Sequence, residues 1–289
     1  MSDNQNEIPV IFEYQGQQLI GIIHQSDTAV KVGVLIVVGG PQYRVGSHRQ
    51  FVLLARYLAS QGIPAMRFDV RGMGDSTGHP HSFRQLDDDI QAAIDCFLTH
   101  CPTLNHVVLW GLCDAASATL FYGYQDSRVK GLVLLNPWVF TEQGSAKTYL
   151  KHYYLQRILS KDLWHKVFSF RFNYADSINS LLNLLRQATG QAKTSQPTET
   201  INEHMILPIR MRECLRQFTY PVLLILSGRD LTADEFKEAV KSDPEWQSLL
   251  DNARITRLEL ADADHTFSSE VWRNQIAEWT AIWVNDLFD

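Results

Sequence analysis

Short apolar runs alternate along the chain with longer segments of helical periodicity, and this alternation limits the possible folds more than any other feature. Most runs are short enough for strands and continuously apolar, as strands covered on both faces are. They lie at residues 10–14, 19–24, 32–39, 64–70, 106–112, 131–136, 222–227 and 255–260. Helical patterns lie at residues 49–61, 86–100, 115–124, 233–250 and 269–287. The order predicts an α/β protein with a doubly wound, mostly parallel sheet of eight strands.

The first two runs differ from the others because their residues alternate between apolar and polar. Gln15, Gly16 and Gln17 are the turn-forming residues that separate them. A short turn between alternating strands is typical of a hairpin with one exposed face. We therefore expect an antiparallel hairpin at one edge of the sheet.

The alternation stops after Trp138 and resumes at Tyr220. The simplest explanation is a helical cap inserted at residues 140–218, between a first core part at 1–139 and a second at 219–289. Its first half is rich in aromatic residues, and residues 187–203 are mostly polar. The aromatic residues are Tyr149, Tyr153, Tyr154, Trp164, Phe168, Phe170, Phe172 and Tyr174.

The predicted cap is basic although the chain is acidic overall. Residues 141–218 hold eleven Lys and Arg against six Asp and Glu, whereas the whole chain has a net charge of -6. A basic, aromatic cap over an acidic body would favour an anionic small-molecule substrate with an apolar part. A solvated helical face over core aromatics explains the same composition, so both interpretations stay open.

The composition of the chain limits its possible binding partners, location and cofactors. The acidic balance argues against nucleic-acid binding and against anionic membranes. The first residues have no signal-peptide pattern and the longest apolar stretch is too short to span a bilayer, so we expect a cytoplasmic protein without stable membrane insertion. The four cysteines lack the spacing of a metal site, so we expect free thiols, no metal and no cofactor. The oligomeric state is not predicted.

Residues 107–119 read Val-Val-Leu-Trp-Gly-Leu-Cys-Asp-Ala-Ala-Ser-Ala-Thr, with Cys113 between the small residues Gly111 and Ala115. An apolar strand, a sharp turn and a helix start form a nucleophile elbow, which lifts the reactive side chain clear of the sheet. The usual pattern is G-x-S-x-G, and here Cys replaces Ser and Ala replaces the second Gly. A buried cysteine that acts as a small apolar residue is the simpler alternative.

A thiol needs a base beside it, and the base needs a group that orients it. Asp230 follows one of the later predicted strands, and His265 follows the last one. An acid and then a histidine after the nucleophile is the order that α/β hydrolases use. We therefore predict a triad of Cys113, His265 and Asp230. Asp230 could instead cap a helix, His265 could be an ordinary loop histidine, and Asp262 and Asp264 compete for the acid's role.

An oxyanion hole requires backbone N–H donors on the residue after the nucleophile and on the loop after the third strand. The first donor is Asp114, and the loop reads Val-Gly-Gly-Pro-Gln at residues 38–42. Pro41 has no N–H, so Gly40 is the predicted second donor and Gln42 the alternative. A plain Gly-Gly-Pro turn would have the same sequence.

The string D-x-R-G-x-G-D-S at residues 69–76 lacks the further residues of a phosphate-binding loop. We interpret Asp69 and Arg71 as structural ties of the turn. The histidines at 79 and 81 with the acids at 87–89 could form a metal site, but a solvated loop before an acidic helix start explains them more simply.

These motifs together resemble the α/β-hydrolase superfamily over residues 8–289. More narrowly, Gly-Leu-Cys-Asp-Ala-Ala-Ser at 111–117, Val-Val-Gly-Gly-Pro-Gln at 37–42 and the turn at 69–76 resemble the first of two hydrolases associated with the bacterial exosortase A protein-sorting system. That resemblance implies a cytoplasmic accessory enzyme and leaves its substrate open. Cys113 departs from the common serine, as in dienelactone hydrolases and polyester synthases.

The residues predict a cysteine hydrolase for an ester or thioester, working through an acyl-enzyme on Cys113. Acyl transfer through the same intermediate is an alternative, because a thioester reacts readily with amines and thiols. A second alternative is a non-catalytic binding protein, because the charge of Asp114 beside Cys113 opposes thiolate formation.

Overall fold

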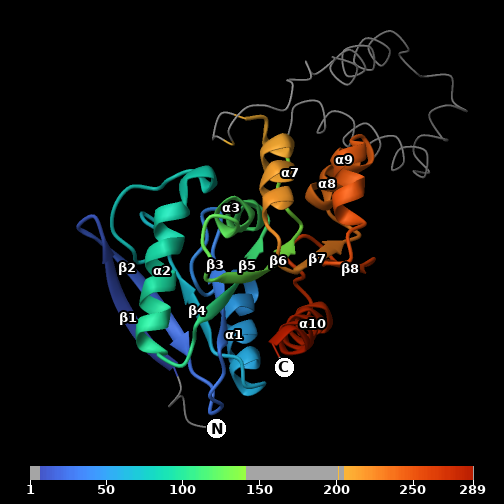
Figure 1. Cartoon of the computed structure of the whole chain (residues 1–289). Helices are drawn as coiled ribbons and strands as arrows, with labels where there is room; N and C mark the ends of the chain where they lie inside the picture. Colours follow the sequence, from blue (N-terminus) through green and yellow to red (C-terminus); the bar gives the residue numbers. More distant parts are fainter. Residues whose placement is uncertain (1–6, 141–200, 202–204, 289) are drawn as a thin grey trace, which may run out of the picture.

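The computed structural model describes residues 7–140, 201 and 205–288. Its strands form one sheet of eight in the order β1-β2-β4-β3-β5-β6-β7-β8 (Figure 1). The two antiparallel pairings of this sheet are β1 with β2 and β2 with β4, and every pairing from β4 to β8 is parallel. The strands are β1 Glu7–Tyr14, β2 Gln17–His24, β3 Val32–Val37, β4 Ala65–Phe68, β5 His106–Leu112, β6 Val129–Leu135, β7 Val222–Ser227 and β8 Ile255–Leu260. The predicted mostly parallel, eight-stranded sheet is confirmed.

Both antiparallel pairings of the sheet involve β2, which lies between β1 and β4. The hairpin of β1 and β2 has Tyr14 opposite Gln17, so two residues make the turn. Gln15 and Gly16 adopt positive φ angles of 49° and 75°, as a tight turn matched to the twist of the strands requires. The predicted antiparallel hairpin at the sheet edge is confirmed.

Helices cover both faces of the sheet. Helices α1 and α10 lie on one face, and α2, α3, α7 and α8 lie on the other (Figure 1). The helices are α1 Gln50–Ser60, α2 Asp87–His100, α3 Asp114–Gly123, α7 Leu207–Gln217, α8 Leu231–Lys241, α9 Pro244–Leu250 and α10 Glu270–Phe288. None of these described helices is both long enough and apolar enough to cross a membrane.

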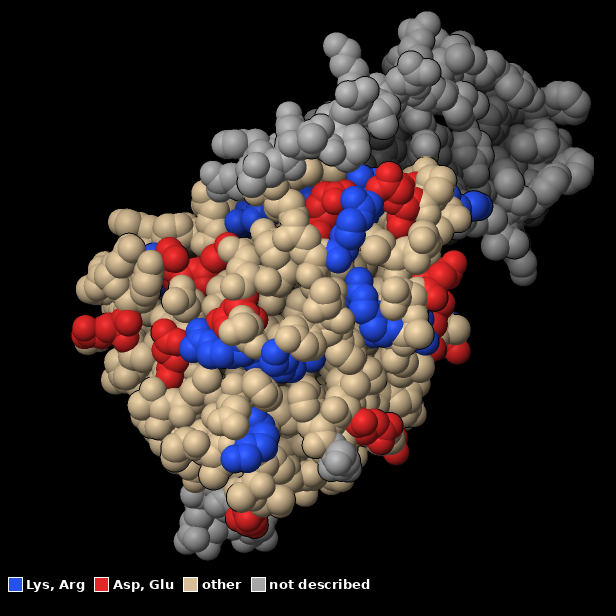
Figure 2. All heavy atoms as spheres, viewed as in Figure 1, with Lys and Arg blue, Asp and Glu red and all other residues tan. Residues whose placement is uncertain are grey.

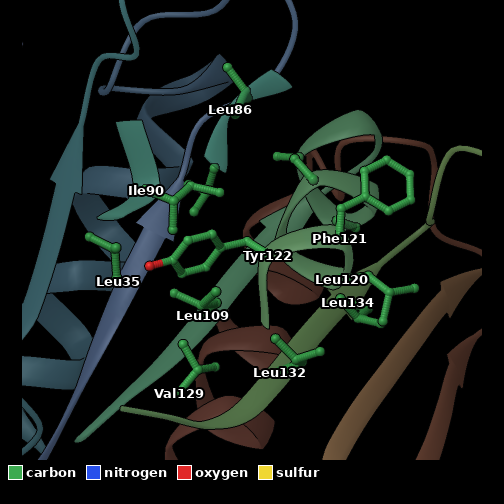
Figure 3. Packing of buried hydrophobic residues seen from close by; sticks show 14 of the residues in the cluster. Leu35, Leu86, Ile90, Leu109, Leu120, Phe121, Tyr122, Val129, Leu132 and Leu134 are labelled. Carbon is green, nitrogen blue, oxygen red and sulfur yellow. The ribbon is translucent and has the colours of Figure 1, made fainter. Parts of the chain in front are cut away.

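The alternation of side chains along each buried strand divides the core into two layers. In β3, Val34 and Ile36 pack with the residues of α1 and α10. Leu35 of the same strand packs on the opposite face with residues of α2 and α3. Figure 3 shows this second layer, with Tyr122 of α3 close to the leucines of β3 and β5. Continuously apolar strands are therefore needed, because each face is covered.

One predicted helix, at residues 233–250, is wrong as a single element. The structure has two helices there, α8 and α9, which are separated at Ser242 and Asp243. Pro244 has no N–H to continue the helix, and it disfavours the helical conformation at Asp243. The Asp243 side chain instead accepts a hydrogen bond from the Glu245 N–H at 2.9 Å and caps α9.

Most of the predicted cap, including its aromatic half, lies outside the described residues. The final part of the range 140–218 forms α7, which packs against α3 and α9. Met211 and Cys214 of α7 are fully buried in the same core layer as α3. The boundaries of the cap stay a prediction, as does its basic surface. On the face of the body seen in Figure 2, acidic and basic side chains are interspersed.

Candidate active site

Cys113 lies at the sharp junction between β5 and α3, at the carboxyl end of the sheet. Its φ of 62° and ψ of -122° are strained for a residue with a side chain. The Cys113 N–H donates to the Leu135 carbonyl of the neighbouring strand at 2.9 Å, which fixes the turn. A Cβ on Gly111 would lie 2.6 Å from the Ala115 carbonyl, so this position requires glycine. The geometry is that of the predicted elbow, with a half-buried thiol.

His265 follows β8 and reaches the residue that follows β7. Its Nδ1 lies 2.9 Å from Asp230 Oδ2. Asp230 also caps α8, because its carboxylate accepts hydrogen bonds from the N–H groups of Thr232 and Ala233, each at 3.1 Å. The capping and the contact with histidine are therefore compatible, since one buried carboxylate makes both.

The surroundings of His265 favour the charged imidazolium. The hydrogen bond to Asp230, followed by a hydrogen bond to Cys113, raises the pKa of His265 to about 10, although burial opposes this change. Nδ1 is occupied by Asp230, so Nε2 is the ring nitrogen left for the thiol. The structure thus brings the three residues of the predicted triad together.

The two competing acids have other partners. Asp262 is exposed and pairs with Arg229, with 2.6 Å between Asp262 Oδ1 and Arg229 Nη2. Asp264 accepts a hydrogen bond from the Ser268 N–H at 3.0 Å, and the Ser268 hydroxyl donates to the same carboxylate. Within the described ranges, the carboxylate bonded to His265 is that of Asp230.

The Asp114 carboxylate lies where the predicted oxyanion donors converge. Its Oδ2 accepts a hydrogen bond from the Gly40 N–H at 2.8 Å, and its Oδ1 accepts one from the Ala115 N–H at 2.9 Å. A Cβ on Gly39 would collide with the same carboxylate. Burial raises the pKa of Asp114, and the hydrogen bonds from Gly40, Ala115 and its own N–H oppose this change. Gly40 is therefore engaged by an internal anion.

The alternative donor, Gln42, lies on the same loop and is half-buried. Its side-chain Oε1 is buried without a hydrogen-bond partner. Gln42 therefore stays the alternative to Gly40.

Asn136 is a residue that the sequence reasoning missed. It follows β6, is fully buried and has a positive φ of 43°. Its Nδ2 donates to Ser227 Oγ at 2.9 Å and to the His265 carbonyl at 3.0 Å, and its Oδ1 accepts from the Ser227 N–H at 2.9 Å. Asn136 therefore fixes the loop between β8 and α10, which carries His265 and is called the histidine loop below, to β6 and β7. A polar residue directly after an apolar strand was the available signal.

The turn at residues 69–76 is structural, as expected. Asp69 accepts hydrogen bonds from the N–H groups of Arg44, at 2.6 Å, and Asp75, at 3.0 Å. Arg71 pairs instead with Asp89, to which its own N–H also donates at 3.0 Å. In the part of the chain that the structure describes, no group of three His, Cys, Asp or Glu residues is arranged to hold a metal ion.

The other three cysteines differ from Cys113 because they are buried. Burial raises the pKa of Cys96 to about 11 and that of Cys214 to about 12, and it also raises the pKa of Cys101. At neutral pH these residues are neutral thiols, in keeping with the expected free cysteines. Cys113 is the half-buried cysteine, and its histidine partner is His265.

Comparisons with known proteins agree with the fold that carries this site. A family model described as serine aminopeptidase, S33, matches residues 29–266. The acyltransferase drtE of Aspergillus calidoustus is 28% identical over 117 residues, which are 39% of this chain and 38% of that relative. The chain therefore matches well under half the length of this curated relative.

Two solved structures match nearly the whole chain. An esterase from Pyrococcus furiosus has a TM-score of 0.64 at 14% identity and covers 98% of this chain and 92% of its own. A dienelactone hydrolase from Anabaena variabilis has a TM-score of 0.61 at 15% identity, with 98% of both chains covered. At such low identity these likenesses show the fold alone.

Proposed function

Because the chain belongs to the serine aminopeptidase S33 family of α/β-hydrolase enzymes, we propose that it cleaves an ester or thioester through an acyl-enzyme on Cys113. The observation that carries the proposal is the contact of 2.9 Å between His265 and Asp230, on a histidine that also bonds to Cys113. Membership of an enzyme family sets aside the non-catalytic alternative.

The proposed first step starts from the contact between Cys113 and His265, whose imidazolium is stabilised by Asp230 and by the sulfur. In this step the histidine takes the proton that a thiol must lose before it attacks. The Cys113 thiolate attacks the acyl carbon, and the leaving group departs with a proton from His265 Nε2. Neutral His265 then takes a proton from water, whose oxygen attacks the thioester and releases the acid. Asp230 keeps Nδ1 protonated throughout.

The oxyanion of each tetrahedral intermediate needs backbone donors. The proposed donors are the N–H groups of Asp114 and Gly40, the second becoming available when the substrate oxygen displaces the Asp114 carboxylate. The hydrogen bond of 2.8 Å from Gly40 to that carboxylate supports a loop able to bind negative charge. Gln42 is the other proposed donor if the carboxylate stays in place.

The family is described by a serine nucleophile, whereas the elbow of this chain carries Cys113. The nearest serine, Ser117, is fully buried in α3, and its hydroxyl donates to the Trp138 carbonyl at 2.8 Å. Ser117 is therefore out of reach of a substrate, and its hydroxyl proton is bonded to a carbonyl instead of a histidine. These observations favour the cysteine as the attacking group.

Acyl transfer is the second candidate function. It is favoured by the similarity to the acyltransferase drtE and by the reactivity of a thioester intermediate toward amines and thiols. Hydrolysis and transfer share every step up to the acyl-enzyme. They differ in whether water or another nucleophile reaches the acyl carbon.

The proposed substrate is a small acyl compound, anionic and with an apolar part, on the strength of the basic, aromatic composition of residues 141–218. A narrower assignment to the exosortase-associated hydrolases of bacteria, acting in the cytoplasm, rests on the motifs at residues 37–42, 69–76 and 111–117. It is part of the same proposal.

Intact-mass spectrometry after incubation with acyl thioesters tests the function. We expect an acyl adduct on the wild-type protein that maps to Cys113 and is absent from Cys113→Ala. The matched control is Cys214→Ala, which removes a buried thiol and leaves the adduct. Undiminished turnover by Cys113→Ala would overturn the proposal. Parallel reactions with an amine acceptor separate the candidates, since an acyl product formed only with the acceptor identifies a transferase.

A further inference from the structure

A small cavity between α1, α10 and the sheet is lined by N–H donors that have no acceptor. Its volume is about 20 Å³. Gln50 Nε2, Trp110 Nε1 and Arg273 Nε are each buried without a hydrogen-bond partner. The lining residues are Gln50, Leu54, Trp110, Leu135, Phe267, Arg273 and Ile276. The polar groups at the cavity therefore offer protons, and one of them belongs to a cation.

Burial makes these unpartnered donors costly to the fold. Gln50 is 9% exposed and Trp110 is 3% exposed, so both side chains are more than nine-tenths buried. An indole and a guanidinium can only donate hydrogen bonds, and the lining includes no carboxylate. Three donors lie on separate elements, and no acidic side chain of the lining accepts their hydrogen bonds. This indicates that an acceptor is missing.

The helices add positive potential to the same place. Gln50 is the first residue of α1, and Arg273 lies in the first turn of α10. The N-terminus of a helix carries a positive partial charge and favours anions nearby. Two such ends and one guanidinium therefore surround a cavity whose other walls are apolar.

Size and charge together select the ligand. A space of this volume holds one water molecule or one monatomic ion. A water molecule would accept from two of the three donors, and its own hydrogens would face a donor-rich wall. An anion accepts from all three and balances the guanidinium. We propose that this cavity binds a monovalent, halide-sized anion such as chloride.

The site is separate from the chemistry at Cys113, but it lies beneath the histidine loop. Phe267, which lines the cavity, is two residues after His265, and Leu135 directly precedes Asn136. A bound anion would hold together α1, α10, β5 and the start of this loop. It is thus a stabilising ligand, not a reactant.

Thermal unfolding at constant ionic strength tests the site, with gluconate replaced stepwise by chloride. We expect a saturable rise in Tm, roughly 3–6 °C at ten times the apparent Kd. Gln50→Leu and Arg273→Met should lose this chloride dependence. The matched control is Arg229→Met, because Arg229 is an exposed arginine paired with Asp262, and it should retain the full response.

Crystals of the wild-type protein in bromide give a test that does not depend on how the variants fold. An anomalous peak between the three nitrogens supports the site. A water molecule there without an anomalous signal overturns it. So does a wild-type Tm that is equal in chloride and gluconate, or a chloride response that is undiminished in both variants.

Discussion

Asp114 places a negative charge directly after Cys113, the proposed nucleophile, where it opposes both a thiolate and an oxyanion. The fold holds this carboxylate with N–H groups from Gly40 and Ala115, yet burial still raises its pKa. The charged form is therefore less favourable in the folded protein than in the unfolded chain. We infer that the carboxylate restrains the site until substrate displaces it.

Replacing Asp114 by Asn should relieve this restraint while keeping an oxygen that Gly40 can bond to. We expect iodoacetamide to label Cys113 faster at neutral pH, because the negative charge beside the thiol is removed. Because an acid whose pKa is raised by folding destabilises the fold above its ordinary pKa, the variant should also have a higher Tm at neutral pH. The control is Asp262→Asn, an exposed acid near the site. An unchanged labelling curve would show that Asp114 exerts no electrostatic restraint.

The raised pKa of His265 predicts how activity and stability depend on pH. Turnover should fall as pH rises through about 10, because the imidazolium that protonates the leaving group is lost. A histidine with a raised pKa stabilises the fold fully below about 6.5, and this contribution is lost as pH rises from there to about 10. Profiles of kcat/KM and of Tm against pH check both effects. A fall in kcat/KM that already begins near pH 7 would contradict the contacts described for His265.

At the scale of elements, Asp230 joins two functions because it caps α8 and orients His265. The sequence predicted both roles separately, since an aspartate before a helix and an acid after a strand are local patterns. It could not predict that one carboxylate has both, because the contact with His265 spans 35 residues. The division of α8 from α9 at Pro244 was readable from the sequence, but the periodicity of residues 233–250 obscured it.

Two substitutions separate the roles of Asp230. Asn is as good a cap as Asp but carries no charge to stabilise the His265 imidazolium, so Asp230→Asn should lose most of its kcat and the part of the stability that depends on this imidazolium. Asp230→Ala should lose, in addition, about 1 kcal/mol for the missing cap. Denaturant unfolding and initial rates measure the two effects. Asp243→Ala in α9 is the matched control, since it removes a cap and should leave kcat unchanged.

Asn136 connects three elements through its buried amide, and its removal should loosen the histidine loop. We expect Asn136→Ala to lose about 1–3 kcal/mol of unfolding free energy, because buried groups of Ser227 and His265 are left without partners. The kcat should fall more than KM rises, since the loop carries His265, the proposed base. If the variant and the wild-type protein had the same kcat at saturating substrate, Asn136 would have a role in packing alone.

For the whole molecule, the order of apolar runs predicted the sheet, and three strand ends predicted where Cys113, Asp230 and His265 would meet. Parallel strands bring their carboxyl ends to one edge, so chain order was enough for that step. The Asp114 contact with Gly40 spans 74 residues, and the Asn136 contact with His265 spans 129. Such contacts depend on side-chain directions that spacing along the sequence does not determine.

The contrast between a basic insert and an acidic body belongs to the same scale. If residues 141–218 attract an anionic acyl donor, neutralising Lys147, Lys151 and Arg157 should raise KM for anionic donors and leave KM for neutral esters unchanged. Steady-state kinetics at low and high salt check this, because the difference should shrink as salt screens the charges. Equal changes for both donor types would point to packing instead of attraction.

The packing of α10 against α1 has a consequence for the timing of synthesis. Helix α1 forms early in the chain, but the layer it shares with α10 stays incomplete until residues 270–288 have left the ribosome. His265 emerges just before that helix. The nascent chain therefore exposes the apolar surface of α1 while residues 61–269 are being made, and His265 arrives shortly before that surface is covered.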